Sequence, residues 1–205
     1  MLEAAGAEAT SDTSESEGRR RILDEAARLF VDQGYAATTL RQIATAAGIK
    51  AGSVYYHYAS KDELFDAVLA RGIDVMEAAF ADAAEGSVGH DGRTTLRHHV
   101  RAHLASLFEH GPYTAAHVTA FHTAPPEVRT AAIERRDAYE SLWTELLHDL
   151  MAEGDLRPDL HVTTTRLILF GAMNSTVEWF DPDGRRNLDE LAEAITEQFW
   201  SGAAT

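Results

Sequence analysis

The sequence predicts an all-α protein of about nine helices, arranged in two domains. Apolar residues recur at intervals of three and four along most of the 205-residue chain, as they do on one face of a helix. No segment alternates apolar and polar residues in the manner of a half-buried strand. Glycine and proline separate the apolar stretches and so mark the expected ends of helices. Because 45% of the residues are hydrophobic, a packed core is expected.

The N-terminal residues differ in composition from the rest of the chain. Residues 1–18 carry five acidic residues and no basic one, so we expect a disordered acidic tail there. They lack the basic start and the apolar run of a signal peptide. The first helix is expected over residues 20–34, and Gly34 ends it. Its apolar stripe consists of Ile22, Ala26, Leu29 and Phe30.

Residues 39–61 predict a helix-turn-helix, the motif that places one helix in the major groove of DNA. Thr39 and Gln42 have the spacing of a capping box, so a helix can start at Thr39. Gly48 can adopt the left-handed conformation that ends this helix. The helix gains one buried face from Leu40, Ile43, Ala44 and Ala47.

The second helix of the motif is expected over residues 51–57. It starts with the small residues Ala51, Gly52 and Ser53, which let its backbone approach DNA closely. The free N–H groups of the helix start favour phosphate. Ser60 and Glu63 have the spacing of a second capping box and open a fourth helix.

Six further helices follow the motif in the prediction. They cover residues 61–84, 93–110, 113–122, 126–152, 161–180 and 188–201. The breaks between them contain Gly86, Gly111, Pro112, Pro125, Pro126, Gly154, Pro158 and Gly184. The helix over 161–180 is too apolar to be freely exposed, so either the core of one chain or a second copy must cover it.

Charge is distributed unevenly along the chain. The formal net charge is −15, yet residues 19–61 carry seven basic and three acidic residues. Both lysines of the chain, Lys50 and Lys61, fall in this segment. A small cationic patch on an anionic body suits a protein that touches a polyanion with one end. The absence of cysteine excludes disulfides and thiolate metal sites, and no apolar run approaches the ~18 residues of a membrane span.

Residues 20–69 resemble the N-terminal domain of transcriptional regulators of the TetR/AcrR type. Three segments carry the resemblance: Ile22–Phe30, Gly34–Ala44 and Ala47–Leu64. It implies a helix-turn-helix DNA-binding domain over 19–64 and a helical effector-binding and dimerisation domain over 65–205. It further implies a cytoplasmic homodimer, paired through its last two helices, that represses transcription and is released from a palindromic operator by a small molecule.

The same resemblance implies which residues touch DNA. Thr39, Tyr56 and Lys61 are expected to hold phosphates, and Arg41, Lys50, Ala51, Gly52, Ser53 and Tyr55 are expected to face the groove. Arg41 could bond the O6 and N7 atoms of guanine in bidentate fashion. Phe30 and Tyr35 are expected in the core and His57 as a packed or capping residue. For residues 19–21, contact with the DNA backbone and a role in keeping the helix start solvated are both open.

The C-terminal body is expected to hold an effector pocket that is mostly apolar with a few polar anchors. Its candidate lining residues are Phe108, His117, Phe121, Tyr139, Trp143, Phe170 and Asn174. Residues 171–184 also resemble a segment of TetR-type repressors that respond to coenzyme A thioesters, although Ser175 stands where those proteins have tryptophan. An effector of that kind would need arginines for its phosphates, such as Arg97, Arg101 or Arg166.

Three alternatives remain open at the level of sequence. His99 and His103 share a helix face and could bind zinc, but no further metal motif accompanies them, and we expect no metal and no cofactor. A helical enzyme or small-molecule-binding module would use the C-terminal body, yet no nucleophile elbow or phosphate loop supports an enzyme. An architectural DNA-binding protein would need a larger basic surface than this chain has.

Overall fold

The computed structural model describes residues 4–205, with side chains described for residues 17–205. Over this range the all-α prediction is confirmed, because the chain forms α-helices and two short 3₁₀ helices and no sheet. The elements are α1 (Ala4–Ala37), α2 (Leu40–Ala46), α3 (Ala51–His57), α4 (Lys61–Glu85), α5 (Gly92–Phe108), α6 (Pro112–Thr119), η1 (Phe121–Thr123), α7 (Pro126–Ala152), α8 (Val162–Asn174), η2 (Ser175–Glu178) and α9 (Leu188–Ala203). None of the described helices has the length and apolar character that crossing a membrane requires.

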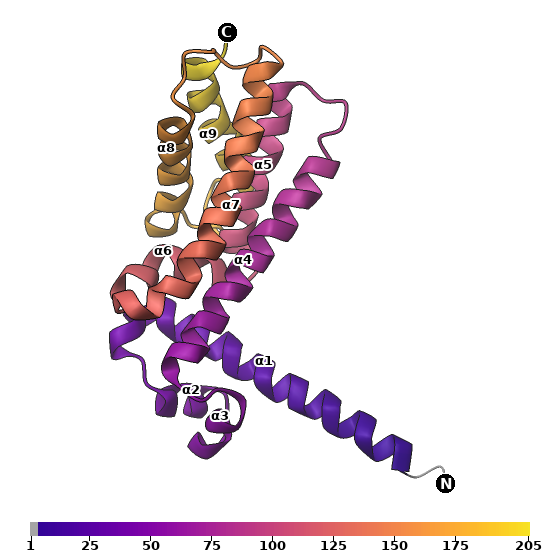
Figure 1. Ribbon diagram of the computed structural model, residues 1–205, viewed down its shortest axis with the longest axis vertical. Coiled ribbons are helices and arrows are strands. Elements are labelled where there is room, and N and C mark those ends of the chain that lie inside the picture. Colours follow the sequence, from indigo (N-terminus) through magenta and orange to yellow (C-terminus); the bar gives the residue numbers. More distant parts are fainter. Residues whose placement is uncertain (1–3) are drawn as a thin grey trace.

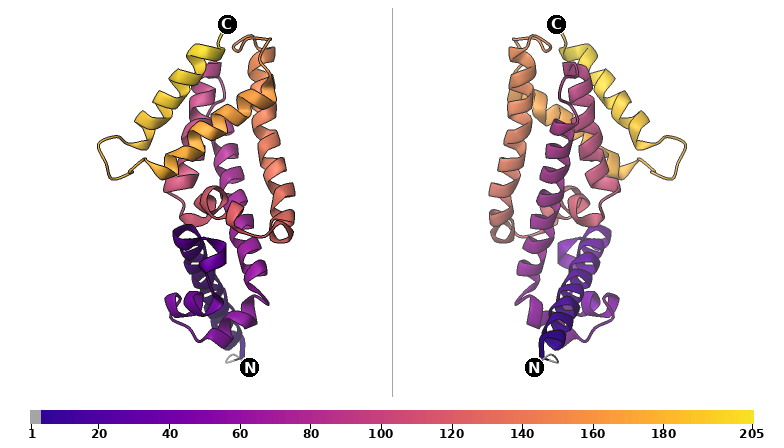
Figure 2. Two further views of the ribbon diagram at one scale, coloured as in Figure 1. Left: turned by 90° about the vertical axis from the view of Figure 1, so that its left-hand side faces the viewer. Right: turned by 90° about the vertical axis from the view of Figure 1, so that its right-hand side faces the viewer.

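The helices form an elongated body with a small unit at one end. Helices α4, α5 and α7 run along the body, and α8 and α9 lie on one side of it (Figure 1). Helices α2 and α3 lie at the end opposite the C-terminus (Figure 1). The connection between η2 and α9 projects from the side of the body (Figure 2). The body therefore carries α2 and α3 at one end and α8 and α9 along one side.

Helix α1 begins earlier than the sequence indicated. It starts at Ala4, so the expected disordered tail is corrected to helix for residues 4–18, while residues 1–3 lie outside the described residues. Alanine and glutamate, which are frequent in this segment, have high helix propensity, and a helix anchored by its packed part can extend beyond it. The expected break at Gly34 is present, because its φ of 79° and ψ of 167° are not helical.

Two helices of the prediction end sooner in the structure. The segment expected as one helix over 161–180 divides into α8 and the 3₁₀ turn η2. The segment expected over 113–122 divides into α6 and η1. Hydrophobic periodicity does not distinguish α-helix from a 3₁₀ continuation over so few residues, which explains both differences.

Two buried cores hold the molecule together. One of them, called the second core below, joins apolar side chains of α4, α5, α7, α8 and α9. The other, called the first core, unites α1, α2, α3 and the start of α4 with residues of α6, η1 and α7, including Tyr113, Ala116, Phe121 and Ala132. The expected domain boundary after residue 64 is therefore not a boundary in packing, since the DNA-binding unit shares its core with the body.

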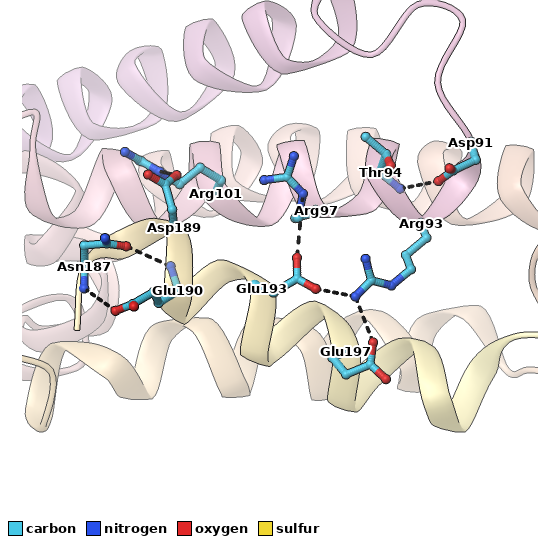
Figure 3. A network of polar contacts seen from close by, with 10 residues as sticks. All are labelled: Asp91, Arg93, Thr94, Arg97, Arg101, Asn187, Asp189, Glu190, Glu193 and Glu197. Carbon is cyan, nitrogen blue, oxygen red and sulfur yellow. Dashed lines mark hydrogen bonds and ion pairs between the residues drawn. The ribbon is translucent and has the colours of Figure 1, made fainter.

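Ion pairs fasten α9 to α5 along an antiparallel ladder (Figure 3). Three arginines of α5 at four-residue intervals face three carboxylates of α9 at the same intervals. Arg93 pairs with both Glu193 and Glu197, and its distance to the Glu197 Oε2 is 2.8 Å. At the other end the Arg101 Nε lies 2.8 Å from the Asp189 Oδ1. Between them, the Arg97 Nε lies 3.8 Å from the Glu193 Oε2.

Candidate DNA interface and effector cavity

The helix-turn-helix has the geometry that the sequence predicted. The Thr39 backbone N–H donates to the Gln42 Oε1 at 2.8 Å, and the Gln42 backbone N–H donates to the Thr39 Oγ1 at 3.3 Å, which completes the capping box. Gly48 has a φ of +68°, so the turn uses the left-handed conformation. Val54, fully buried, anchors α3 to the first core. The anchored helix keeps its other face free.

Eight of the nine residues that were predicted to contact DNA are exposed, on α2, α3 and the residues next to them. The exposed residues are Thr39, Arg41, Lys50, Ala51, Gly52, Ser53, Tyr55 and Tyr56. Tyr55 and Tyr56 are 60% and 73% exposed, which is unusual for residues of their size. Among the described residues neither Arg41 nor Lys50 has an ion pair within 4.0 Å. The exposed residues of the helix-turn-helix therefore include two unneutralised cations and two aromatic rings.

Lys61, the ninth predicted contact, has a different environment. Its ammonium is half-buried and donates to the carbonyl oxygens of Tyr35 at 2.9 Å and Thr38 at 3.1 Å. It also lies 4.0 Å from the centroid of the Tyr35 ring. Lys61 thus ties the start of α4 to the connection between α1 and α2, which leaves one N–H for any contact with phosphate.

Phe30 and Tyr35, which were expected in the core, lie there, whereas His57 is only partly buried. Phe30 is fully buried and Tyr35 is 7% exposed, and both rings pack against Phe65 with centroids 4.8 and 5.0 Å away. The Tyr35 hydroxyl donates to the Asp62 carboxylate. Of the arginines 19–21, Arg19 is engaged in the fold, because its Nε donates to the buried Tyr58 hydroxyl at 3.3 Å.

A small cavity of about 30 Å³ lies in the middle of the body. It is lined by Ile73, Met76, His103, Thr114, His117, Val118, Arg136, Tyr139, Glu140, Phe170 and Asn174. Four predicted pocket residues are among these: His117, Tyr139, Phe170 and Asn174. A cavity of this size holds about one or two water molecules, so it is too small for an effector as it stands.

The other three predicted pocket residues lie elsewhere. Phe121 belongs to the first core, where Arg136 covers its ring at 4.5 Å. Phe108 packs against Phe180 with ring centroids 5.3 Å apart. Trp143 is fully buried behind the cavity wall, 5.5 Å from the Phe170 ring centroid. Helical periodicity places all three inside, but it does not tell core from cavity wall.

His103 is the central polar residue of the cavity, although it was not among the seven predicted pocket residues. The Tyr139 hydroxyl donates to its Nδ1 at 2.9 Å, and its Nε2 donates to the Asn174 Oδ1 at 3.0 Å. Burial lowers the pKa of His103 to about 4, so the ring is neutral at physiological pH. These two hydrogen bonds fix one tautomer of His103 and connect α7, α5 and α8.

His117 connects the cavity to the DNA-binding unit. Its Nε2 donates to the Leu69 carbonyl oxygen of α4 at 2.7 Å, and burial lowers its pKa to about 4. Its Nδ1 is buried and has no partner among the described residues. Gly72 permits this close approach of α6 to α4, because a Cβ there would lie 2.9 Å from the His117 Cδ2 and 2.7 Å from the Tyr113 carbonyl oxygen.

The segment of α6 and η1 also holds α1. The Tyr113 hydroxyl donates to the Asp24 carboxylate, and the Tyr35 backbone N–H donates to the Thr123 Oγ1 at 2.9 Å. Since Thr114 and His117 on the same helix line the cavity, α6 is in contact with both the cavity and the helix that supports the helix-turn-helix.

Helices α8 and α9 expose an apolar surface. Leu167 and Ile168 of α8 are 57% and 64% exposed, and Trp179, directly after η2, is 62% exposed. Beside them lies a groove of about 440 Å³, lined mostly by apolar side chains such as Ile168, Leu191, Ile195 and Phe199. One chain alone therefore leaves this face of the eighth and ninth helices uncovered.

The arginines considered for phosphate groups are already paired. Arg97 and Arg101 belong to the ladder with α9, and the Arg166 Nη2 lies 2.9 Å from the Glu140 Oε2. Each guanidinium would have to leave a carboxylate before it could bind an anion. Among the side chains that the structure describes, no group of three or more His, Asp or Glu residues is arranged to hold a metal ion.

Comparison with known proteins identifies relatives of the whole chain. The family model described as "Bacterial regulatory proteins, tetR family" matches residues 22–68, and "Tetracyclin repressor-like, C-terminal domain" matches residues 89–203. The HTH-type transcriptional repressor KstR2 of Rhodococcus jostii is 30% identical, with 95% of each chain covered. The structure of the ketosteroid transcriptional regulator KstR2 of Mycobacterium tuberculosis, 25% identical, has a TM-score of 0.76 and covers 91% of this chain and 95% of that chain. The structure of AibR in complex with isovaleryl coenzyme A and operator DNA, 24% identical, has the same fold, with a TM-score of 0.76 over 88% of this chain and 97% of that chain.

Proposed function

Because the chain belongs to the TetR family of bacterial regulatory proteins, we propose that it is a repressor that binds a palindromic operator as a homodimer and leaves it when an effector binds. The observation that carries the proposal is the free face of α3 and its surroundings. Arg41 and Lys50 of the helix-turn-helix have no counter-ions among the described residues, and the rings of Tyr55 and Tyr56 are exposed. Cations supply affinity for phosphate, and a positioned arginine supplies base selection.

The DNA contacts follow from this face. Arg41, Lys50, Ala51, Gly52, Ser53 and Tyr55 would face the groove, while Thr39, Tyr56 and the remaining N–H of Lys61 would contact phosphates. Since residues 51–53 have short side chains, Arg41, Lys50 and Tyr55 would supply most of the base selection. Contact with chromosomal operator DNA would place the protein in the cytoplasm.

A dimer would cover the apolar surface of α8 and α9. Pairing two copies through these helices would bury Leu167 and Ile168, which are otherwise exposed. It would also set two α3 helices at a fixed distance, as palindromic half-sites require. The ladder between α5 and α9 would then connect the pairing face of each copy to its own cavity wall.

An effector would bind where the small cavity now lies and widen it. Its polar anchors would be His103, His117, Arg136 and Asn174, with Tyr139 and Phe170 along the wall. An acyl-coenzyme A or another hydrophobic compound is the proposed class, on the resemblance of residues 171–184. Because α6 contacts both the cavity and α1, widening the cavity would shift α1 and the helix-turn-helix it supports.

The proposal is tested by selecting bound sequences from random duplex DNA with the full chain and with Arg41→Ala and Tyr55→Ala. A palindromic motif that both variants lose or relax is expected. Arg157→Ala is the matched control, since Arg157 is an exposed arginine in the connection between α7 and α8, at the other end of the body. No enriched motif, or equal enrichment by all four proteins, would contradict the proposal.

A further inference from the structure

Another hollow, larger than the small cavity around His103, lies in the body away from the DNA-binding unit. It has a volume of about 370 Å³ and is bounded by the end of α4, the start of α5 and the second half of α7. Sites for small molecules commonly start at about 300 Å³. Phe80 and Trp143, whose ring centroids are 5.6 Å apart, lie between this hollow and the small cavity around His103.

The floor of the hollow is apolar. Phe80, Ala84, Leu142, Leu146 and Leu150 contribute to its lining. The Phe80 ring belongs to this surface and is held in place by His99, 4.4 Å away between centroids. The floor would accept a hydrocarbon or aromatic group, and the face of Phe80 could stabilise a nearby cation.

The rim of the hollow is acidic. Glu145, Asp149 and Glu153 are exposed and follow one another at four-residue intervals, so they share one face of α7. None of them has an ion pair within 4.0 Å among the described residues, and no lysine or arginine lines the hollow. Like charges at this spacing repel each other, so a bound cation would relieve an unfavourable arrangement.

His99 adds a hydrogen-bond acceptor inside the hollow. The side chain is only 2% exposed, and it belongs to the lining. Its Nδ1 lies 2.8 Å from the Thr95 carbonyl oxygen, which can only accept, so this nitrogen carries the proton. Burial lowers the pKa of His99, which favours the neutral ring. Its Nε2 then has a free lone pair and no hydrogen-bond partner among the side chains that the structure describes.

We propose that this hollow is a binding site for a hydrophobic organic ammonium ion. The apolar part of the ligand would lie on Phe80 and the leucines, its N–H would donate to the His99 Nε2, and its charge would face Glu145 and Asp149. Carboxylates on the rim would repel the phosphates of a coenzyme A thioester, so this site and the proposed effector cavity would differ in ligand class. The inference does not depend on the proposed function, since it concerns binding to the body alone.

The test is calorimetric titration of the full chain at about pH 8, where histidine is neutral, with three probes of similar shape. Phenethylammonium is the cation, phenethyl alcohol the neutral probe and hydrocinnamate the anion. We expect the cation to bind at one site per chain, about tenfold more tightly than the alcohol, and the anion not to bind. Equal affinity for the three probes would overturn the proposal.

Variants locate the binding. Neutralising the rim by Glu145→Gln with Asp149→Asn should weaken the cation about three- to tenfold and leave the alcohol unchanged, because each exposed pair contributes modestly. Glu134→Gln with Asp137→Asn is the matched control, with two exposed carboxylates of α7 outside the hollow. Leu146→Trp should fill the hollow and abolish binding of both probes. Unchanged affinity for the cation in the rim variant, or the same loss in the control, would overturn the assignment.

Discussion

His117 of α6 and Leu69 of α4 are joined by a hydrogen bond of 2.7 Å, from the histidine Nε2 to the leucine carbonyl oxygen. Leu69 belongs to the core that the DNA-binding unit shares with the body, and His117 lines the central cavity. One hydrogen bond therefore joins the proposed effector cavity to the core that supports the helix-turn-helix. A neutral imidazole is needed, because its Nδ1 has no partner among the described residues.

Stability should fall below neutral pH because of His103 and His117. Burial lowers both pKa values to about 4, whereas an unfolded histidine titrates near 6.5. Between these values the unfolded chain binds more protons than the folded one, so the contribution is fully present above about pH 6.5 and is lost as the pH falls towards 4. Urea unfolding at several pH values should show the free energy of unfolding decreasing by at least about 1 kcal/mol per pH unit in this window.

The two histidines can be separated from other acid effects by substitution. His103→Gln with His117→Gln should flatten the pH dependence over the same window, since glutamine does not titrate. The exposed His110→Gln and His122→Gln serve as the control pair and should leave the slope unchanged. A slope that is the same in all three proteins would show that neither buried histidine causes it.

The two lysines of the chain should differ in what they do. Lys61→Met removes the hydrogen bonds to two carbonyl oxygens, so the free energy of unfolding should fall by about 1–2 kcal/mol. Lys50→Met, at an exposed position, should change it by less than about 0.5 kcal/mol and should weaken DNA binding with a smaller salt dependence. Chemical unfolding and DNA titration at several salt concentrations measure both, and equal stability of the two variants would contradict the assignment for Lys61.

The apolar surface of α8 and α9 should be the dimer contact. Ile168→Glu places a carboxylate within that surface and should shift the protein to monomer in light scattering after size-exclusion chromatography. Val88→Glu is the matched control, because Val88 is 83% exposed at the opposite end of α4 from the DNA-binding unit. A dimer that survives Ile168→Glu, or that Val88→Glu disrupts, would place the contact elsewhere.

The ladder between α5 and α9 should stabilise the fold modestly and in a salt-dependent way. Arg101→Glu brings a third carboxylate to Asp189 and Glu109 and should lower the free energy of unfolding by about 1 kcal/mol at low salt. Adding Asp189→Lys should restore part of the loss. Arg157→Glu is the comparison, because the Arg157 Nε lies 3.7 Å from the Asp159 Oδ1 and both residues are exposed. A loss that the second substitution does not reduce would contradict a direct ion pair.

The helices and the DNA-binding face could be predicted because their determinants are local in the sequence. The capping pair Thr39 and Gln42, the turn at Gly48 and the helix of residues 126–152 agree with the structure. The cavity could not be read in the same way. Whether an aromatic residue such as Phe121 or Trp143 faces core or cavity depends on how helices meet in three dimensions, and four of seven candidates line the cavity. His103 was not among the seven candidates, because its partners, Tyr139 and Asn174, are distant in sequence.

The core that crosses the expected domain boundary limits how this protein can be recombined with others. Tyr113, Ala116 and Phe121 complete the packing around Phe65 and Leu69, so residues 19–64 alone would expose apolar surface that is normally covered. A chimaera that joins this helix-turn-helix unit to the effector-binding body of another protein should therefore also include α6, η1 and the first turns of α7. Including these segments keeps the buried contacts within one parent protein, whereas a junction at residue 64 divides the contacts between two parent proteins.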